Sequence, residues 1–132
     1  MKTIAIDFDG VIHKYSEGWK DGTIYDDSFD GVFDIIKDLM KDNSVFIFSS
    51  RSPRQIKKWL KEYLYYATDM PFDEWLFGYS VGIIPFWKKF WTKRNVLGIT
   101  KRKLPAYVYV DDRALKFEGD WNETLTKLKE IL

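Results

Sequence analysis

Short apolar runs alternate along this chain with segments whose apolar residues recur at helical spacing. Residues 2–7 form a β-branched apolar run that ends in an acid, which is typical of a buried strand. Residues 45–48 predict a second buried strand, and residues 96–99 and 107–110 predict two more. The pattern therefore predicts several short strands spread over the whole length of the chain.

Two helices are predicted between the first strands. Apolar residues within 32–39 share one helical face, and Ser28 or Asp30 is the expected cap. Ser52-Pro53 indicates an N-cap followed by proline at the first helical position. An apolar stripe over residues 56–64 continues that second helix.

A last helix is predicted at the end of the chain. Asp120 and Glu123 resemble a capping box at its start. Its buried face is expected to consist of four apolar residues at helical spacing: Trp121, Leu125, Leu128 and Leu132.

Strands separated by helices predict an α/β fold with a mostly parallel sheet and helices on both faces. The 132 residues suit one domain, 1–132. Within it, residues 12–27 are polar and glycine-containing and predict a flap or loop. Residues 68–95 predict a small insertion, in which Pro85 is expected to open a short helix.

Composition narrows the class of protein. The chain has no cysteine, which excludes a disulfide framework and a thiolate metal site. No apolar stretch approaches the ~20 residues of a membrane span, and no secretion signal is recognised, so we expect a cytoplasmic protein without a membrane partner. The 6 Trp and the aromatic content of 18% indicate either a core of large side chains or a platform for a flat ligand.

Acidic pairs follow two of the predicted strands. Asp7 and Asp9 end the first, and Asp111 and Asp112 end the last. Ligands of open α/β sheets bind beyond the carboxyl ends of the strands, so the two pairs are expected to meet there. Carboxylates held close together repel one another unless a cation lies between them. A site made only of oxygen ligands suits Mg²⁺.

With these pairs, the sequence resembles the haloacid dehalogenase superfamily of phosphohydrolases. The run Asp7-Phe8-Asp9-Gly10-Val11 resembles the first motif of that family in full. Ser49, Lys103 and the pair Asp111-Asp112 follow in the order of its other three motifs. The resemblance implies a three-layer Rossmann-like core, and the short gaps between motifs imply that no full cap domain is present.

The resemblance also implies a mechanism: a Mg²⁺-dependent phosphatase that acts on a phosphate monoester. Asp7 is the implied nucleophile, forming an aspartyl phosphate, and Asp9 the implied general acid and base. Mg²⁺ would be held by Asp7, by the main-chain carbonyl of Asp9 and by Asp111. Asp112 would bind it through water or orient the site.

Polar residues beside the motifs complete the predicted site. Ser49 is expected to hydrogen-bond a phosphoryl oxygen and Lys103 to offset negative charge, with Ser50 and Lys101 as alternatives. Substrate-binding residues are expected at Gly10, Ser50 and Arg51, and Arg113 also adjoins the site. His13, by contrast, is expected to be a solvent-facing residue of the flap.

The substrate is left open by the sequence. Residues 85–103 carry seven lysines and arginines without an acid, interleaved with aromatic residues. They predict either a groove for a nucleotide or a nucleic-acid end, or an amphipathic helix with a basic face. A non-catalytic module that binds nucleic acid or phosphate is the alternative to a phosphatase, and a phosphoacceptor signalling domain fits less well.

Overall fold

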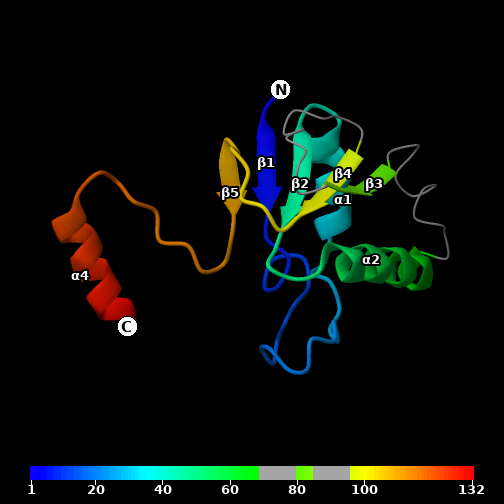
Figure 1. The fold of residues 1–132 in the computed structure, drawn as a ribbon, viewed down its shortest axis with the longest axis horizontal. Helices are drawn as coiled ribbons and strands as arrows, with labels where there is room; N and C mark the ends of the chain where they lie inside the picture. Colours follow the sequence, from blue (N-terminus) through cyan, green and yellow to red (C-terminus); the bar gives the residue numbers. More distant parts are fainter. Residues whose placement is uncertain (69–79, 85–95) are drawn as a thin grey trace.

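The computed structural model describes residues 1–68, 80–84 and 96–132. A five-stranded sheet lies at its centre, and every strand pair in it is parallel (Figure 1). In the order of the sheet, the strands are β3 (Ser80–Ile83), β4 (Val96–Thr100), β2 (Ser44–Phe48), β1 (Thr3–Ile6) and β5 (Val108–Val110). The predicted α/β fold with a parallel sheet is confirmed.

The strand order makes the end of β1 a switch point. From β1 the chain moves to β2 on one side, whereas β5 pairs with β1 on the other side. Ile6 of β1 is in register with Ile47 of β2 and with Val110 of β5, so these three strands end at the same level. Connections leave in opposite directions at such a point, and a crevice opens beyond the carboxyl ends of the strands.

Helices α1 (Val32–Met40) and α2 (Pro53–Thr68) pack on one face of the sheet. The connections β1–α1–β2 and β2–α2–β3 run in the same direction, and right-handed crossovers then put both helices on the same side. The buried core between the layers is aliphatic and aromatic, and its largest part consists of Ile4, Ile6, Val45, Ile47, Leu97, Ile99, Phe33, Ile36, Met40, Ile56 and Leu60.

The opposite face of the sheet has a smaller core. Of the residues that the structure describes, Ala5 and Phe46 form a small buried cluster there with Leu104, which lies in the connection from β4 to β5. Among the described residues, the expectation of helices on both faces is therefore met on one face. The short helix expected from Pro85 and most of the expected insertion lie outside the described residues.

The last helix, α4 (Trp121–Ile131), has no buried residue, and the prediction of a buried face is wrong. Trp121 is 71% exposed and Leu125 49%. Figure 1 shows α4 well away from the sheet, at the end of an extended segment that follows β5. Helical periodicity is a local property, whereas burial depends on a partner surface that the sequence does not identify.

The predicted N-cap is confirmed for helix α4 but not for helix α1. The Asp120 side chain accepts hydrogen bonds from the backbone N–H groups of Asn122 and Glu123, as expected of an N-cap. For α1 the cap is instead Gly31, at φ 76°, without a side-chain hydrogen bond, so both candidates proposed for that cap are wrong.

Strand β3 was not predicted. Its four residues include Gly82, and glycine weakens the strand signal of so short a run. No helix within residues 1–68, 80–84 and 96–132 combines the length and the apolar character needed to cross a bilayer.

A substitution at Gly98 of β4 tests the packing on the sheet face that carries Ala5 and Phe46. A Cβ atom at Gly98 would collide with the ring of Phe46. We expect Gly98→Ala to lower the free energy of unfolding in urea by about 1–3 kcal/mol, because an added methyl group overpacks the core. Phe46→Leu should recover part of this loss in the double variant. Additive effects of the two changes would contradict this account.

Candidate active site

The ends of β1 and β5 bring three carboxylates together. The backbone N–H of Asp7 donates to the carbonyl of Val110 at 3.0 Å, which extends the β1–β5 pairing by one residue. Asp111 and Asp112 follow directly. One carboxylate oxygen from each of Asp7, Asp111 and Asp112 lies within 4.8 Å of the others. The acidic pairs, 102 residues apart in sequence between Asp9 and Asp111, thus meet at one end of the sheet.

These oxygens fit a hard divalent cation. Metal–oxygen distances of about 2.0–2.6 Å allow one ion to reach oxygens at this separation. Asp7 is half-buried, whereas Asp111 and Asp112 are exposed, so water or a substrate oxygen has access to the remaining coordination positions. The chemistry of the donors suits Mg²⁺, which retains several waters when bound by a few carboxylates.

The pKa of Asp7 is raised to about 6, chiefly because burial disfavours its charged form. A hydrogen bond from the backbone N–H of Phe8, 2.7 Å from Oδ1, opposes this shift. Repulsion from Asp111, Asp112 and Asp9 adds to it. A cation among these carboxylates would relieve the repulsion and favour the ionised form of Asp7.

Asp9 is held differently from Asp7. His13 Nδ1 lies 2.8 Å from Oδ1 of Asp9, and Arg51 Nε donates to Oδ2 at 2.7 Å. The Asp9 side chain is 22% exposed. Two strong donors therefore fix the orientation of its carboxyl group, which is separate from the cluster formed by the side chains of Asp7, Asp111 and Asp112. A metal contact through the Asp9 carbonyl stays a prediction.

His13 is fully buried, so the prediction of a solvent-facing flap residue is wrong. Its Nε2 accepts a hydrogen bond from the backbone N–H of Asp26 at 3.0 Å. Because an amide can only donate, Nε2 is unprotonated and Nδ1 carries the hydrogen given to Asp9. The spacing of four residues from Asp9 was the sequence signal for this contact. It was missed because periodicity does not show that the turn after Phe8 folds inwards.

Arg51 reaches the site through Asp9. Its side chain is only 2% exposed, and its Nη1 donates to the carbonyl of Gly22 at 2.7 Å. Arg51 thereby links the end of β2 to the flap, residues 12–27, as well as to Asp9. A guanidinium suits this position because it offers several donors in fixed directions. Its expected contact with substrate stays a prediction.

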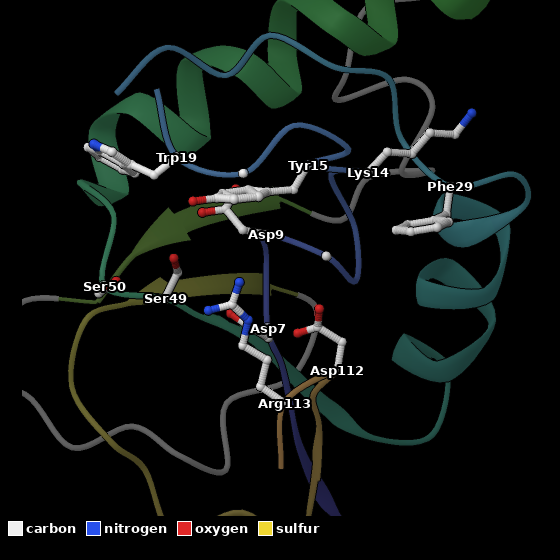
Figure 2. Close-up of a pocket in the computed structure, with 12 residues that line it drawn as sticks. Asp7, Asp9, Lys14, Tyr15, Trp19, Phe29, Ser49, Ser50, Asp112 and Arg113 are labelled. Atoms are coloured by element: carbon white, nitrogen blue, oxygen red, sulfur yellow. The ribbon is translucent and has the colours of Figure 1, made fainter. Parts of the chain in front are cut away.

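A cleft of about 520 Å³ opens over the carboxylates (Figure 2). It brings together most of the residues expected in the site with several from the flap. Its lining consists of Asp7, Asp9, Gly10, Lys14, Tyr15, Gly18, Trp19, Phe29, Ser49, Ser50, Asp112 and Arg113.

Both candidate serines line this cleft. Ser49 is buried, and its hydroxyl oxygen accepts a hydrogen bond from the backbone N–H of Arg51 at 3.1 Å. That contact leaves the Ser49 hydroxyl hydrogen available to a bound anion. Ser50 is exposed at the edge. The geometry favours Ser49 as the better ordered donor.

Lys103 lies on the face of the sheet that carries Ala5. It lines a second cavity, of about 260 Å³, together with Asp7 and Asp111. Its ammonium nitrogen lies 5.8 Å from the centre of the Tyr109 ring. Lys103, although exposed, thus shares a cavity with two of the clustered acids, whereas Lys101 is an exposed residue just after β4 that does not line this cavity.

Gly10 allows Asp112 into the site. Its φ is 82°, and a Cβ atom built on it would collide with the Asp112 carboxylate. Both the backbone conformation and the close approach therefore require glycine. The role expected from the sequence was substrate binding, and the glycine does line the cleft.

No protein-family model matches the chain, and no curated protein or solved structure matches it significantly. What the site does must therefore be argued from its own residues.

We expect Asp7→Asn to stabilise the metal-free protein at about pH 7. Because the pKa is raised from 3.8 to about 6, the native state keeps a proton that the unfolded state releases, and the stability of the wild type falls as pH rises through this window. Asparagine does not titrate. In urea unfolding with a chelator present, Asp7→Asn should raise the free energy of unfolding by on the order of 1 kcal/mol at about pH 7, a value already reduced because Asp7 is half-exposed. At about pH 4 the two proteins should be equally stable.

Gly10→Ala should weaken divalent-cation binding about 10-fold, because the new methyl group displaces Asp112. Gly31→Ala is the matched control, since Gly31 also has positive φ, 76°, but nothing lies within 4 Å of an added Cβ. Mg²⁺ titrations followed by thermal unfolding would separate the two effects. Equal Mg²⁺ affinities in both variants would contradict the proposed role of Gly10.

Proposed function

We propose that this protein is a Mg²⁺-dependent phosphohydrolase of the haloacid dehalogenase type, with a Rossmann-like core and no full cap domain. The observation that carries the proposal is the meeting of Asp7 with Asp111 and Asp112 at the switch point of the sheet, beside Ser49. Phosphoryl transfer needs a positioned nucleophile and neutralisation of charge, and these residues supply both.

Asp7 is the nucleophile in this proposal. Among the described contacts its Oδ1 accepts one hydrogen bond, from Phe8, which orients the carboxylate at the floor of the cleft. Its other oxygen attacks phosphorus as the bond to the leaving oxygen breaks, and an aspartyl phosphate forms. The raised pKa of Asp7, about 6, reflects a carboxylate with few solvating partners, which suits a nucleophile.

Asp9 is the general acid and base in this proposal. In the first step the protonated form of Asp9 gives its proton to the leaving oxygen. In the second step the resulting carboxylate takes a proton from the water that attacks the aspartyl phosphate, releasing inorganic phosphate and the Asp7 carboxylate. His13 and Arg51 each use one lone pair of Asp9 and leave the others for this proton. Their hydrogen bonds fix the direction in which Asp9 presents it.

The remaining residues neutralise and orient the phosphoryl group. Mg²⁺ held by Asp7, Asp111 and Asp112 would offset the charge of the phosphate as it approaches the carboxylate. Ser49 donates its hydroxyl hydrogen to a phosphoryl oxygen. Lys103 contributes positive charge next to Asp7 and Asp111.

Hydrolysis of p-nitrophenyl phosphate tests the proposal. We expect turnover that requires Mg²⁺ and falls at least about 1,000-fold in Asp7→Asn. Asp42→Asn, at an exposed position outside the cleft, is the control and should retain activity. Equal turnover in wild type and Asp7→Asn would contradict the assignment of Asp7 as the nucleophile. Salt-dependent binding of nucleic acid without any turnover would indicate the binding module instead.

A further inference from the structure

Three aromatic side chains form one wall of the cleft that contains Asp7. Tyr15, Trp19 and Phe29 line it on the side of the flap. Figure 2 shows Tyr15 and Trp19 across the cleft from Asp112 and Arg113. Trp19 is 64% exposed and Phe29 41%. Large rings left open to solvent beside reactive carboxylates indicate a surface for a ligand.

Trp19 is held in place rather than loosely exposed. The guanidinium carbon of Arg51 lies over its indole ring, 4.9 Å from the centre. A Cβ atom at Gly22 would lie 3.6 Å from two carbons of the same ring, so the Gly22 backbone packs against it. The Gly22 carbonyl is itself fixed by Arg51 and by Gln55, at 2.7 Å and 2.6 Å. A ring ordered before binding loses little entropy when a ligand stacks on it.

Hydrogen bonds also hold the rest of the flap in place. The Asp26 carboxylate accepts from the hydroxyl and the backbone N–H of Ser16, at 2.6 Å and 3.0 Å. Tyr15 has φ 57°, a left-handed conformation that is unfavourable for a side chain of this size. Such conformations persist where the surroundings enforce them, commonly at binding sites. The Tyr15 ring lies edge-on to His13, the partner of Asp9, with ring centres 5.9 Å apart, and it lines the cleft (Figure 2).

The size and charge of the cleft fit more than a phosphate. Its volume of about 520 Å³ is in the range of pockets that hold small organic ligands. Arg113 lines it and supplies a cationic side chain for an anionic ester, whereas the Lys14 ammonium points away from the carboxylates (Figure 2). The aromatic wall then meets the part of the substrate that leaves with the oxygen.

We propose that the cleft selects phosphorylated nucleosides, with the base stacked on Trp19 and the phosphate on Asp7. The inference rests on the proposed phosphatase activity and names its substrate class. The same chemistry is offered by a free nucleotide and by the phosphorylated end of an oligonucleotide. A sugar phosphate without a base leaves the aromatic wall unused.

The test compares AMP with ribose 5-phosphate, which carries the anomeric hydroxyl where AMP carries the base. We expect wild-type kcat/KM to favour AMP, and Trp19→Ala to lower the ratio of kcat/KM for AMP to that for ribose 5-phosphate about 10-fold. Trp19→Phe should retain most of the preference, since it keeps an aromatic ring. Trp121→Ala is the matched control, because Trp121 is a similarly exposed indole on α4, 71% exposed and outside the cleft.

Two results would overturn the inference. One is a wild-type enzyme that prefers neither AMP nor a 5′-phosphorylated oligonucleotide to ribose 5-phosphate. The other is an equal loss for both substrates in Trp19→Ala, which would make Trp19 a structural residue. In either case Asp7-dependent hydrolysis of p-nitrophenyl phosphate would still support the phosphatase proposal, so the two failures are distinguishable.

A last comparison separates the two sources of the ligand. A 5′-phosphorylated oligonucleotide and AMP are assayed side by side in wild type and Trp19→Ala. Trp19-dependent turnover of either supports the inference and identifies the source. Turnover of neither, with p-nitrophenyl phosphate still hydrolysed, overturns it.

Discussion

The parallel pairing of β1 with β5 is the constraint on which the site depends. It places Val110 opposite Ile6, so the residues that follow on each strand, Asp7 and Asp111, emerge at the same point of the sheet. The pairing therefore stabilises the sheet while it forces like charges together. Burial and repulsion both raise the pKa of Asp7. Nothing in the fold requires acids at these positions, and an apolar or amide side chain would avoid the repulsion. Such local conflict is typical of functional sites.

A second constraint acts through one buried arginine. Arg51 is bound to Asp9, to the Gly22 carbonyl and to the Trp19 ring, so it connects the carboxylate proposed for proton transfer to the flap. Removing one member of a buried ion pair leaves the other charge uncompensated and typically costs about 3–5 kcal/mol. The flap is therefore part of the stable body of the protein. The flap is thus held by the same Arg51 guanidinium that orients Asp9.

The sequence predicted features that depend on local chemistry. The four predicted strands, the start of α2 at Pro53 and the Asp120 cap all follow from short-range patterns that the structure confirms. The meeting of the acidic pairs could be predicted because parallel strands share one end. Features that depend on distant partners were missed. His13 is buried because the flap folds over it, and α4 is exposed because its apolar face meets no surface in the described residues that buries it.

Asp7 and Asp9 show how two identical side chains, separated by Phe8 alone, come to differ. Asp7 is half-buried among other acids, with a hydrogen bond from Phe8 as its described stabilising contact, and its pKa is raised. Asp9 is held on both oxygens by donors from His13 and Arg51. In the proposed mechanism, poor solvation favours attack on phosphorus by the first carboxylate, and fixed orientation favours proton transfer by the second. Phe8, fully buried between them, anchors the turn whose geometry separates the two environments, because its carbonyl accepts from the backbone N–H groups of Ile12 and His13. The difference in environment, and with it the difference in proposed role, thus arises from the turn that follows β1 rather than from the acids themselves.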